Sequence, residues 1–136
     1  MPSRERICVA LNHELSDMLP IDFGAMRSTG INAMAYNCLL KKLGLNDRRA
    51  KVYDVFQQLA KPDLDVLARM GGDVVQAHRL ALAFDIPIDK WKEWTLQDGS
   101  PGLFPKTYDP VENVKGYDIC DKATLVAFGG NVFEQG

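Results

Sequence analysis

Residues 20–37, PIDFGAMRSTGINAMAYN, place a proline, a short apolar run, a glycine, a polar turn and an amphipathic helix side by side. The first five of these residues, 20–24, are mostly apolar and are bounded by Pro20 and Gly24. This pattern predicts a strand or extended segment that enters a turn. The stretch therefore predicts a strand, a turn and a helix in succession, near the start of a chain of 136 residues.

The helix of this stretch has the clearest periodicity in the chain. Its apolar residues recur at i, i+3, i+4, i+7 and i+8 and predict one buried stripe: Ile31, Met34, Ala35, Cys38 and Leu39. We expect Thr29 to cap this helix and Gly44 to end it. On the N-terminal side, we expect Ser3 to cap a short helix that ends before Pro20. Cys8 and Cys38 lie on or beside apolar helix faces, which predicts that they are small buried hydrophobes.

The stretch after residue 50 is ambiguous. Residues 51–61 fit helical spacing, but their β-branched and aromatic side chains also suit a strand, and we interpret them as a loop that leads into a helix. Pro62 suits the first turn of that helix, whose apolar stripe ends at Gly71 and consists of Leu64, Leu67 and Ala68. Residues 73–77, DVVQA, predict a buried strand. A helix that passes into a strand is typical of α/β layers.

The last third of the chain changes character. From Trp91 onward the turn signals QDGS, ENVKG and FGGN separate short runs rich in Val, Leu, Phe, Tyr and Thr, which predicts an antiparallel meander. We expect one domain over residues 1–136, with helices and early strands in 1–88 and the meander in 89–136. Trp91 and Trp94 are expected to pack the meander on the helices, with a stacking surface as the alternative.

Composition narrows the function. Sixteen Lys and Arg against eighteen Asp and Glu give a net charge of -2, which disfavours partners such as nucleic acid or a membrane surface. Three widely spaced cysteines suit reduced thiols in a cytosolic protein, so we expect no disulfides. The N-terminus lacks a signal-peptide core, and no apolar run approaches the roughly 18 residues of a spanning helix. The protein is therefore expected to be cytoplasmic.

Candidate site residues are few. The possible metal ligands do not pair at the spacing of zinc motifs, so we expect no metal site among His13, His78, Cys8, Cys38 and Cys120. The most unusual carboxylate is Asp22, which lies in an apolar segment before a glycine turn. It either faces a ligand or closes the turn at Gly24 by a hydrogen bond. Arg27 could pair with Asp22, bind an anionic ligand or be exposed to solvent.

Four ordered segments, SRERICVALNHELSDMLPIDFG, TGINAMAYNCLLKKLGL, KVYDVFQQLAKPDLDVLARMGGDVV and WKEWTLQDGSPGLFPKTYDP, make the chain resemble uroporphyrinogen decarboxylase-like proteins. The match runs from about residue 3 to residue 133, covers the N-terminal third or so of the family, and is closest to its corrinoid-dependent methyltransferases. The resemblance implies a TIM (β/α) barrel in which 20–24 and 73–77 are early strands. It also implies that Asp22 and Arg27 face a substrate pocket and that the meander is a flap at the barrel mouth.

Two departures separate the chain from the true decarboxylases. These carry an arginine-rich motif, P-V-W-x-M-R-Q-A-G-R, which holds substrate carboxylates, whereas residues 20–29 read PIDFGAMRST. They also carry a catalytic aspartate after a strand like DVV, where this chain has no carboxylate until Asp85. Both departures argue against porphyrinogen decarboxylation.

The resemblance and the length together predict an incomplete barrel. The related methyltransferases activate a thiol with zinc held by a His-x-Cys pair and a distant Cys in later strands, and a closed barrel takes about 250 residues. We therefore expect the N-terminal portion of such an enzyme, a split subunit or a truncated product, with zinc and a corrinoid only in the complete enzyme. Its expected partners are the C-terminal barrel portion or a second copy, and a corrinoid protein is a further candidate. Two alternatives remain open, a non-catalytic interaction module that pairs with a complete barrel or with itself, and a fragment of a decarboxylase.

Overall fold

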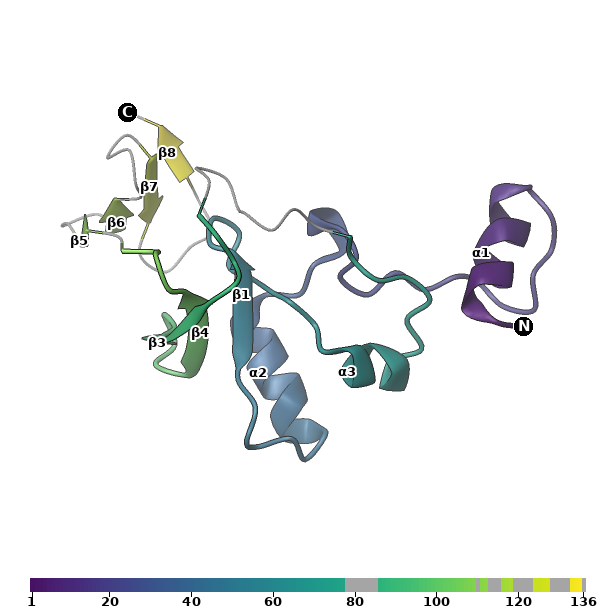
Figure 1. Cartoon of the computed structure of the whole chain (residues 1–136), viewed down its shortest axis with the longest axis horizontal. Coiled ribbons are helices and arrows are strands. Elements are labelled where there is room, and N and C mark those ends of the chain that lie inside the picture. The colour runs from purple at the N-terminus through teal and green to yellow at the C-terminus, as the bar shows by residue number, and fades with distance from the viewer. Residues whose placement is uncertain (78–85, 110, 113–115, 119–123, 128–132, 136) are drawn as a thin grey trace. The chain divides into compact units, whose positions relative to one another are not determined.

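The computed structural model describes residues 1–77, 86–109, 111–112, 116–118, 124–127 and 133–135. In these ranges the chain is mixed α/β, with three α-helices and a four-stranded mixed sheet. It divides into two compact units, of which unit 1 comprises Met1–Ile31 and Pro62–His78 and unit 2 comprises Asn32–Lys61 and Arg79–Gly136 (Figure 1).

The mixed sheet belongs to unit 2 and has the strand order β2-β1-β4-β3. β1 (Ala50–Asp54) pairs antiparallel with β2 (Leu59–Ala60) and parallel with β4 (Pro101–Pro105), and β4 pairs antiparallel with β3 (Trp91–Thr95). The predicted loop at 51–61 is therefore wrong, since most of this stretch forms the β1-β2 hairpin. The local pattern allowed either structure, and pairing with β4 decides for the strand because it satisfies the backbone groups of β1.

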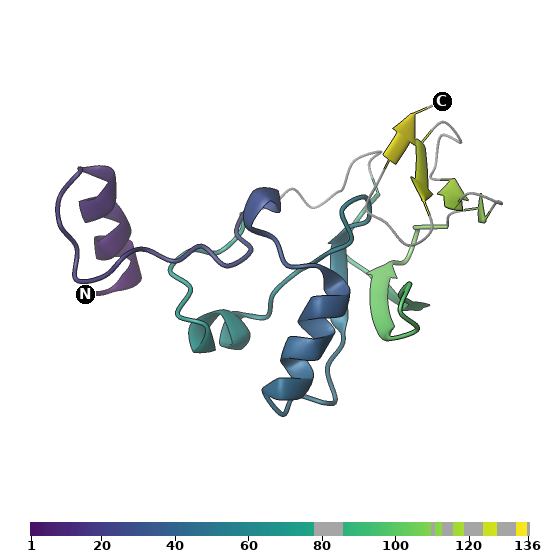
Figure 2. The ribbon, with the colours of Figure 1, turned by 180° about the vertical axis from the view of Figure 1, so that it is seen from behind.

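α2 (Ala33–Lys42) packs against β1, and both views of the ribbon show the two elements side by side (Figures 1 and 2). Asn32, not the predicted Thr29, caps it by accepting a hydrogen bond from the Met34 backbone N–H at 2.9 Å. The predicted end is confirmed, because Gly44 follows the helix with a φ of +76°. The buried face differs from the predicted stripe and consists of Ala33, Tyr36, Asn37 and Leu40.

The shift of the buried face has a chemical cause at Asn37. Its Oδ1 accepts from the Ala50 backbone N–H at 2.9 Å, and its Nδ2 donates to the Pro101 carbonyl at 2.8 Å and to Ser100 Oγ at 3.1 Å. A polar side chain can be buried when its hydrogen bonds are made, so Asn37 joins α2 to β1 and to the start of β4. As a result Cys38 and Ala35 lie on the exposed side of α2.

The predicted meander is confirmed as a series of antiparallel pairs but is not one appended sheet. β3 and β4 form a hairpin with Trp91 opposite Pro105 and Thr95 opposite Pro101, and this hairpin joins β1 in the mixed sheet. A second sheet follows in the order β5-β6-β7-β8, with antiparallel pairing throughout. Its strands are β5 (Val111–Glu112), β6 (Gly116–Asp118), β7 (Thr124–Ala127) and β8 (Phe133–Gln135). The residues between these strands, 113–115, 119–123 and 128–132, lie outside the described ranges, and with them most of the predicted turns ENVKG and FGGN.

Unit 1 contains α1 (Ser3–Leu11), the short 3-10 helix η1 (Arg27–Thr29) and α3 (Leu64–Arg69). Both α-helices were predicted, although Pro2 takes the N-cap position expected for Ser3. The buried residues of α3 are Val66 and Leu67, whereas Leu64 of the predicted stripe is 71% exposed. No described helix is both long enough and apolar enough to cross a membrane.

The two strands predicted in unit 1 do not form. Residues 20–24 and 73–77 are irregular, and Val75 is 64% exposed, so the expectation of a buried strand at DVVQA is wrong for this chain. A strand needs hydrogen-bonded neighbours on at least one side, and most of the backbone of these two segments has no ladder partner in the described part.

Substitution of Asn37 by Asp tests how α2 is held. The carboxylate can still accept from Ala50, but it cannot donate to Pro101, and it places a charge beside two oxygens. We expect the free energy of unfolding in urea to fall by about 2 kcal/mol or more, because a buried polar group loses its partners. The control Asn46→Asp makes the same change at an exposed position and should have little effect. Equal effects of the two variants would contradict this role of Asn37.

Candidate functional site

The turn that carries Asp22 is closed by its own side chain. Asp22 Oδ1 accepts a hydrogen bond from the Ala25 backbone N–H at 2.8 Å, and Gly24 adopts a φ of +85°. A Cβ on Gly24 would lie 2.8 Å from Cγ of Pro62, so the position requires glycine both for its backbone angle and for its small size. Of the two interpretations open for Asp22, the structure contains the hydrogen bond that closes the turn.

Arg27 follows as the first residue of η1, and its side chain is exposed. Thr29 closes this short helix, because its Oγ1 lies 3.2 Å from both the backbone N and the backbone O of Met26. Asp22 and Arg27 are thus brought onto one continuous turn that side chain–backbone hydrogen bonds stabilise at both ends. Contact of either residue with a substrate stays a prediction.

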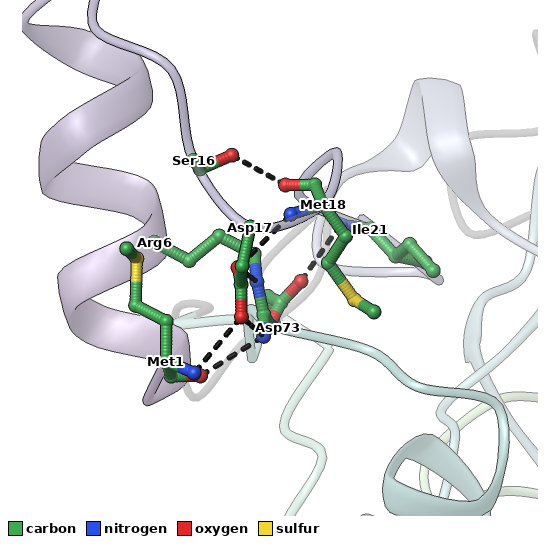
Figure 3. Close-up of polar contacts among 7 residues, drawn as sticks. All are labelled: Met1, Arg6, Ser16, Asp17, Met18, Ile21 and Asp73. Atoms are coloured by element: carbon green, nitrogen blue, oxygen red, sulfur yellow. Dashed lines mark hydrogen bonds and ion pairs between the residues drawn. The ribbon is translucent and has the colours of Figure 1, made fainter.

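The segment that leads into this turn is joined to the segment after α3 at one residue pair. The Asp73 backbone N–H donates to the Ile21 carbonyl at 2.8 Å, and the Ile21 backbone N–H donates to Asp73 Oδ2 at 2.9 Å (Figure 3). The two segments predicted as early barrel strands therefore meet side by side, although neither forms a strand. The Asp73 side chain is 2% exposed.

The other oxygen of Asp73 belongs to an ion-pair cluster around Arg6. Nη1 of Arg6 pairs with Asp73 Oδ1, and Nε pairs with Asp17 Oδ1 at 2.8 Å. Nη2 donates to Asp17 Oδ2 at 3.2 Å and to the Met1 carbonyl at 2.9 Å (Figure 3). Arg6 is the one buried residue of α1, so this guanidinium is the main point at which α1 is fastened.

The cluster keeps its groups charged. Hydrogen bonding to Arg6, and then to the N-terminal ammonium, holds the pKa of Asp17 well below its ordinary 3.8. The Ile21 backbone N–H, followed by the Ser3 hydroxyl and Arg6, lowers the pKa of Asp73. Asp17 above all, with Asp73, raises the pKa of Arg6. These groups are ionised and engaged at neutral pH, which suits a structural network and not proton transfer.

Sequence reasoning missed Arg6, Asp17 and Asp73. Its one available signal was a carboxylate at residue 73, between two glycines and two valines, where burial demands a partner. The partner lies 67 residues away, so no local pattern reveals it.

The described residues contain no cluster of three or more His, Cys, Asp or Glu that could hold a metal ion. Cys8 and Cys38 are exposed free thiols, which corrects the expectation that they are buried. His78 and Cys120 lie outside the described residues.

Unit 2 carries an open depression of about 510 Å³ beside the β3-β4 hairpin. Its lining includes Trp94 and the exposed ion pair of Arg49 with Glu93. Trp94 also packs against Phe104 and Tyr108, with ring centroids 5.4 and 5.7 Å away. Trp94 therefore packs as predicted, but on a strand and a loop residue instead of the helices.

Large apolar side chains are exposed throughout unit 1. All ten large hydrophobic residues with high exposure in the described part belong to this unit: Met1, Leu11, Leu15, Met18, Leu19, Ile21, Met26, Leu64, Met70 and Val75. Leu15 is 100% exposed and Leu19 is 84% exposed. By contrast, Val66 and Leu67 are the large apolar side chains of unit 1 that are buried in the described part. The exposed residues are spread over the N-terminus and α1, the loop that follows it, the turn before α2, and α3 with the segment after it.

No family model, curated protein or solved structure matches this chain.

Substitution of Gly24 by Ala tests the close contact of the Asp22 turn with Pro62. Both Gly24→Ala and the control Gly71→Ala place Ala at a positive φ in unit 1, which costs roughly 1–2 kcal/mol. The Cβ clashes with Pro62 in the first case, whereas in the second it meets only Ile21 Cδ1 at 3.6 Å. We expect Gly24→Ala to lower the free energy of unfolding by about 1 kcal/mol more than Gly71→Ala. Indistinguishable denaturation curves would disprove the contact with Pro62.

The ion-pair cluster predicts a pH dependence of stability. Asp17 and Asp73 have pKa values lowered by folding, so their stabilisation is fully present above the ordinary value of 3.8 and is lost as pH falls below it. We expect the free energy of unfolding to decrease with acid over this window, and Arg6→Met to make that decrease shallower. Arg4→Met, which makes the same change at an exposed position of unit 1, should leave the acid dependence unchanged. An identical acid dependence with and without Arg6 would exclude the cluster as its source.

Proposed function

We propose that this chain is the N-terminal portion of a TIM-barrel methyltransferase of the uroporphyrinogen decarboxylase-like kind, and that it is not catalytic by itself. It contributes one wall of the substrate pocket through Asp22 and Arg27. Zinc, a corrinoid and the methyl-accepting thiol belong to the complete enzyme, which is expected to act in the cytoplasm.

The pairing of Ile21 with Asp73 is the observation that carries this proposal. In a (β/α) barrel, consecutive strands lie side by side, and the segments at 20–24 and 73–77 are those that the resemblance assigns to early strands. They are joined by a backbone hydrogen bond of 2.8 Å, with a second bond of 2.9 Å to the Asp73 carboxylate. This contact at one residue pair is the support for the proposal, although neither segment is a strand and β1 and β2 lie between them in the sequence.

The place of the candidate pocket residues supports the same proposal. Asp22 and Arg27 lie directly after Ile21, on the turn that leaves the first of these segments. Barrel enzymes build their active sites from such turns at the C-terminal ends of the strands. An exposed guanidinium on this turn is suited to bind an anionic group of the substrate.

The exposed apolar side chains of unit 1 support the proposal that the chain is one portion of a larger enzyme. Side chains such as Leu15 and Leu19 are costly to leave in water, whereas they would be covered if further helices and strands packed on unit 1. The same surface supports the rival proposal, a non-catalytic module that pairs with a complete barrel or with itself. A fragment of a true decarboxylase has less support, because residues 20–29 lack the arginine-rich motif.

Reconstitution of the chain with a C-terminal barrel portion that carries the zinc ligands tests the proposal. Methyl transfer from methylcobalamin is measured with 3-mercaptopropionate and with uncharged 2-mercaptoethanol. If Arg27 binds the anionic group, Arg27→Ala should lower kcat/KM for the anionic thiol about tenfold or more, as the loss of a charged hydrogen bond implies. The uncharged thiol should be little affected.

Arg4→Ala is the matched control, since it removes an equal charge from an exposed position of unit 1. An equal loss in both variants, or the same loss with both thiols, would contradict the role of Arg27. The rival module predicts a defined oligomer of the isolated chain by light scattering and no methyl transfer in any combination. A monodisperse monomer together with transfer on reconstitution supports the enzyme.

A further inference from the structure

We propose that Asp73 is a positioning residue, which together with Arg6 sets the place of the turn that carries Asp22 and Arg27. Its effect on catalysis rests on the proposed function. Its structural part concerns the isolated chain and can be tested without any activity.

Asp73 holds Ile21 by two hydrogen bonds of opposite direction. The Asp73 N–H donates to the Ile21 carbonyl, and the Asp73 carboxylate accepts from the Ile21 N–H. One bond would leave the peptide free to rotate about it, whereas two bonds on both polar groups of one residue fix its position and its orientation. Both groups of Ile21 are backbone atoms, so the effect does not depend on the Ile21 side chain.

The carboxylate of Asp73 is itself held in one orientation. Oδ2 accepts from Ile21, while Oδ1 pairs with Nη1 of Arg6, so the two oxygens have different partners from different segments. Rotation of the side chain would break both interactions together. The 2% exposure of this side chain also means that water cannot readily replace either partner.

The two bonds from Asp73 to Ile21 also restrain the turn that carries Asp22, because Ile21 and Asp22 are neighbours in the chain. Ile21 is bonded directly to Asp22, and Asp22 closes its turn on Ala25. Gly24 lies against Pro62, which gives the turn a second point of support. Without Asp73 the turn keeps its internal hydrogen bond and the Pro62 contact, but the segment that enters it loses an anchor. Arg27, later in the same turn, would then sample a wider range of positions.

Asp73 is not a catalytic residue in this proposal. It is buried, and both of its oxygens are engaged, so it cannot contact a substrate without losing the bonds described above. The residue acts through Ile21, and its removal should change the order of the turn before it changes any chemistry.

Hydrogen exchange of single amides in the isolated chain, followed by NMR, tests this role. Asp73→Ala should raise the exchange rate of the Ile21 amide by about tenfold or more, the value expected for a lost hydrogen bond. The Ala25 amide should exchange faster as well, because its turn loses an anchor. Asp73→Asn, which keeps one acceptor oxygen, should give a smaller change and serves if the alanine variant does not fold.

Asp17→Ala is the matched control. It also removes a carboxylate from Arg6, but in the described structure Asp17 is hydrogen-bonded to Met1, Arg6 and Met18 and not to Ile21. Protection of the Ile21 and Ala25 amides should therefore stay within about twofold of the parent. Equal loss of protection in the two variants would show a general loosening of unit 1 and would overturn the proposal. Unchanged protection in Asp73→Ala would overturn it too.

The reconstituted enzyme separates this inference from the proposed function. Asp73→Ala should lower kcat/KM for 3-mercaptopropionate, and the double variant with Arg27→Ala should show little further loss, because the first residue acts through the turn of the second. Fully additive losses would overturn positioning. If no combination transfers a methyl group, the proposed function fails, while the exchange rates of Ile21 and Ala25 still decide whether Asp73 positions the turn.

Discussion

The buried carboxylate of Asp73 is the constraint on which the arrangement of unit 1 depends. It joins three segments that are distant in sequence: α1 through Arg6, the segment at Ile21, and its own position after α3. An unpaired buried carboxylate is costly, so these partners are required once the residue is enclosed. The cluster around Arg6 thus links α1 to the segments at Asp17 and Asp73. Many of the large apolar side chains of unit 1 are exposed to solvent.

In unit 2, by contrast, the buried side chains are mostly apolar. Its sheet and α2 enclose apolar side chains such as Tyr36, Val52 and Phe104, each with at most 1% exposure. The buried polar side chain of Asn37 enters this core with its hydrogen bonds made, between α2 and the two central strands. The two units thus differ in how their side chains are distributed: apolar side chains are enclosed in unit 2, whereas many large ones are exposed in unit 1.

These features give the proposed function a physical basis. A pocket wall needs side chains held in place by their surroundings, and the turn of Asp22 and Arg27 is supported by Asp73 on one side and by Pro62 on the other. The described residues offer a positioned turn and an exposed guanidinium, but no cluster of three or more His, Cys, Asp or Glu that could hold a metal ion. Under the proposed function, these residues form a binding wall and the reactive groups of a methyltransferase belong to the rest of the barrel.

Local sequence patterns were sufficient to predict the elements that depend on neighbouring residues alone. α1, the end of α2 at Gly44, α3 after Pro62 and the β3-β4 hairpin follow from glycine, proline and the spacing of apolar residues. The turn at Asp22 was likewise predictable, because an aspartate and a glycine can form it without distant partners. What the amino-acid sequence determined alone is therefore the set of helices and turns that neighbouring residues stabilise.

Tertiary structure decided the rest. The stretch at 51–61 became a hairpin because β4, about 50 residues later, pairs with β1, and α2 turned its Asn37 face inward because Ala50 and Pro101 complete its hydrogen bonds. The segments at 20–24 and 73–77 did not become strands, since a strand exists only with a ladder partner. Arg6 and Asp73 form an ion pair across 67 residues, and only the folded chain brings their charges together.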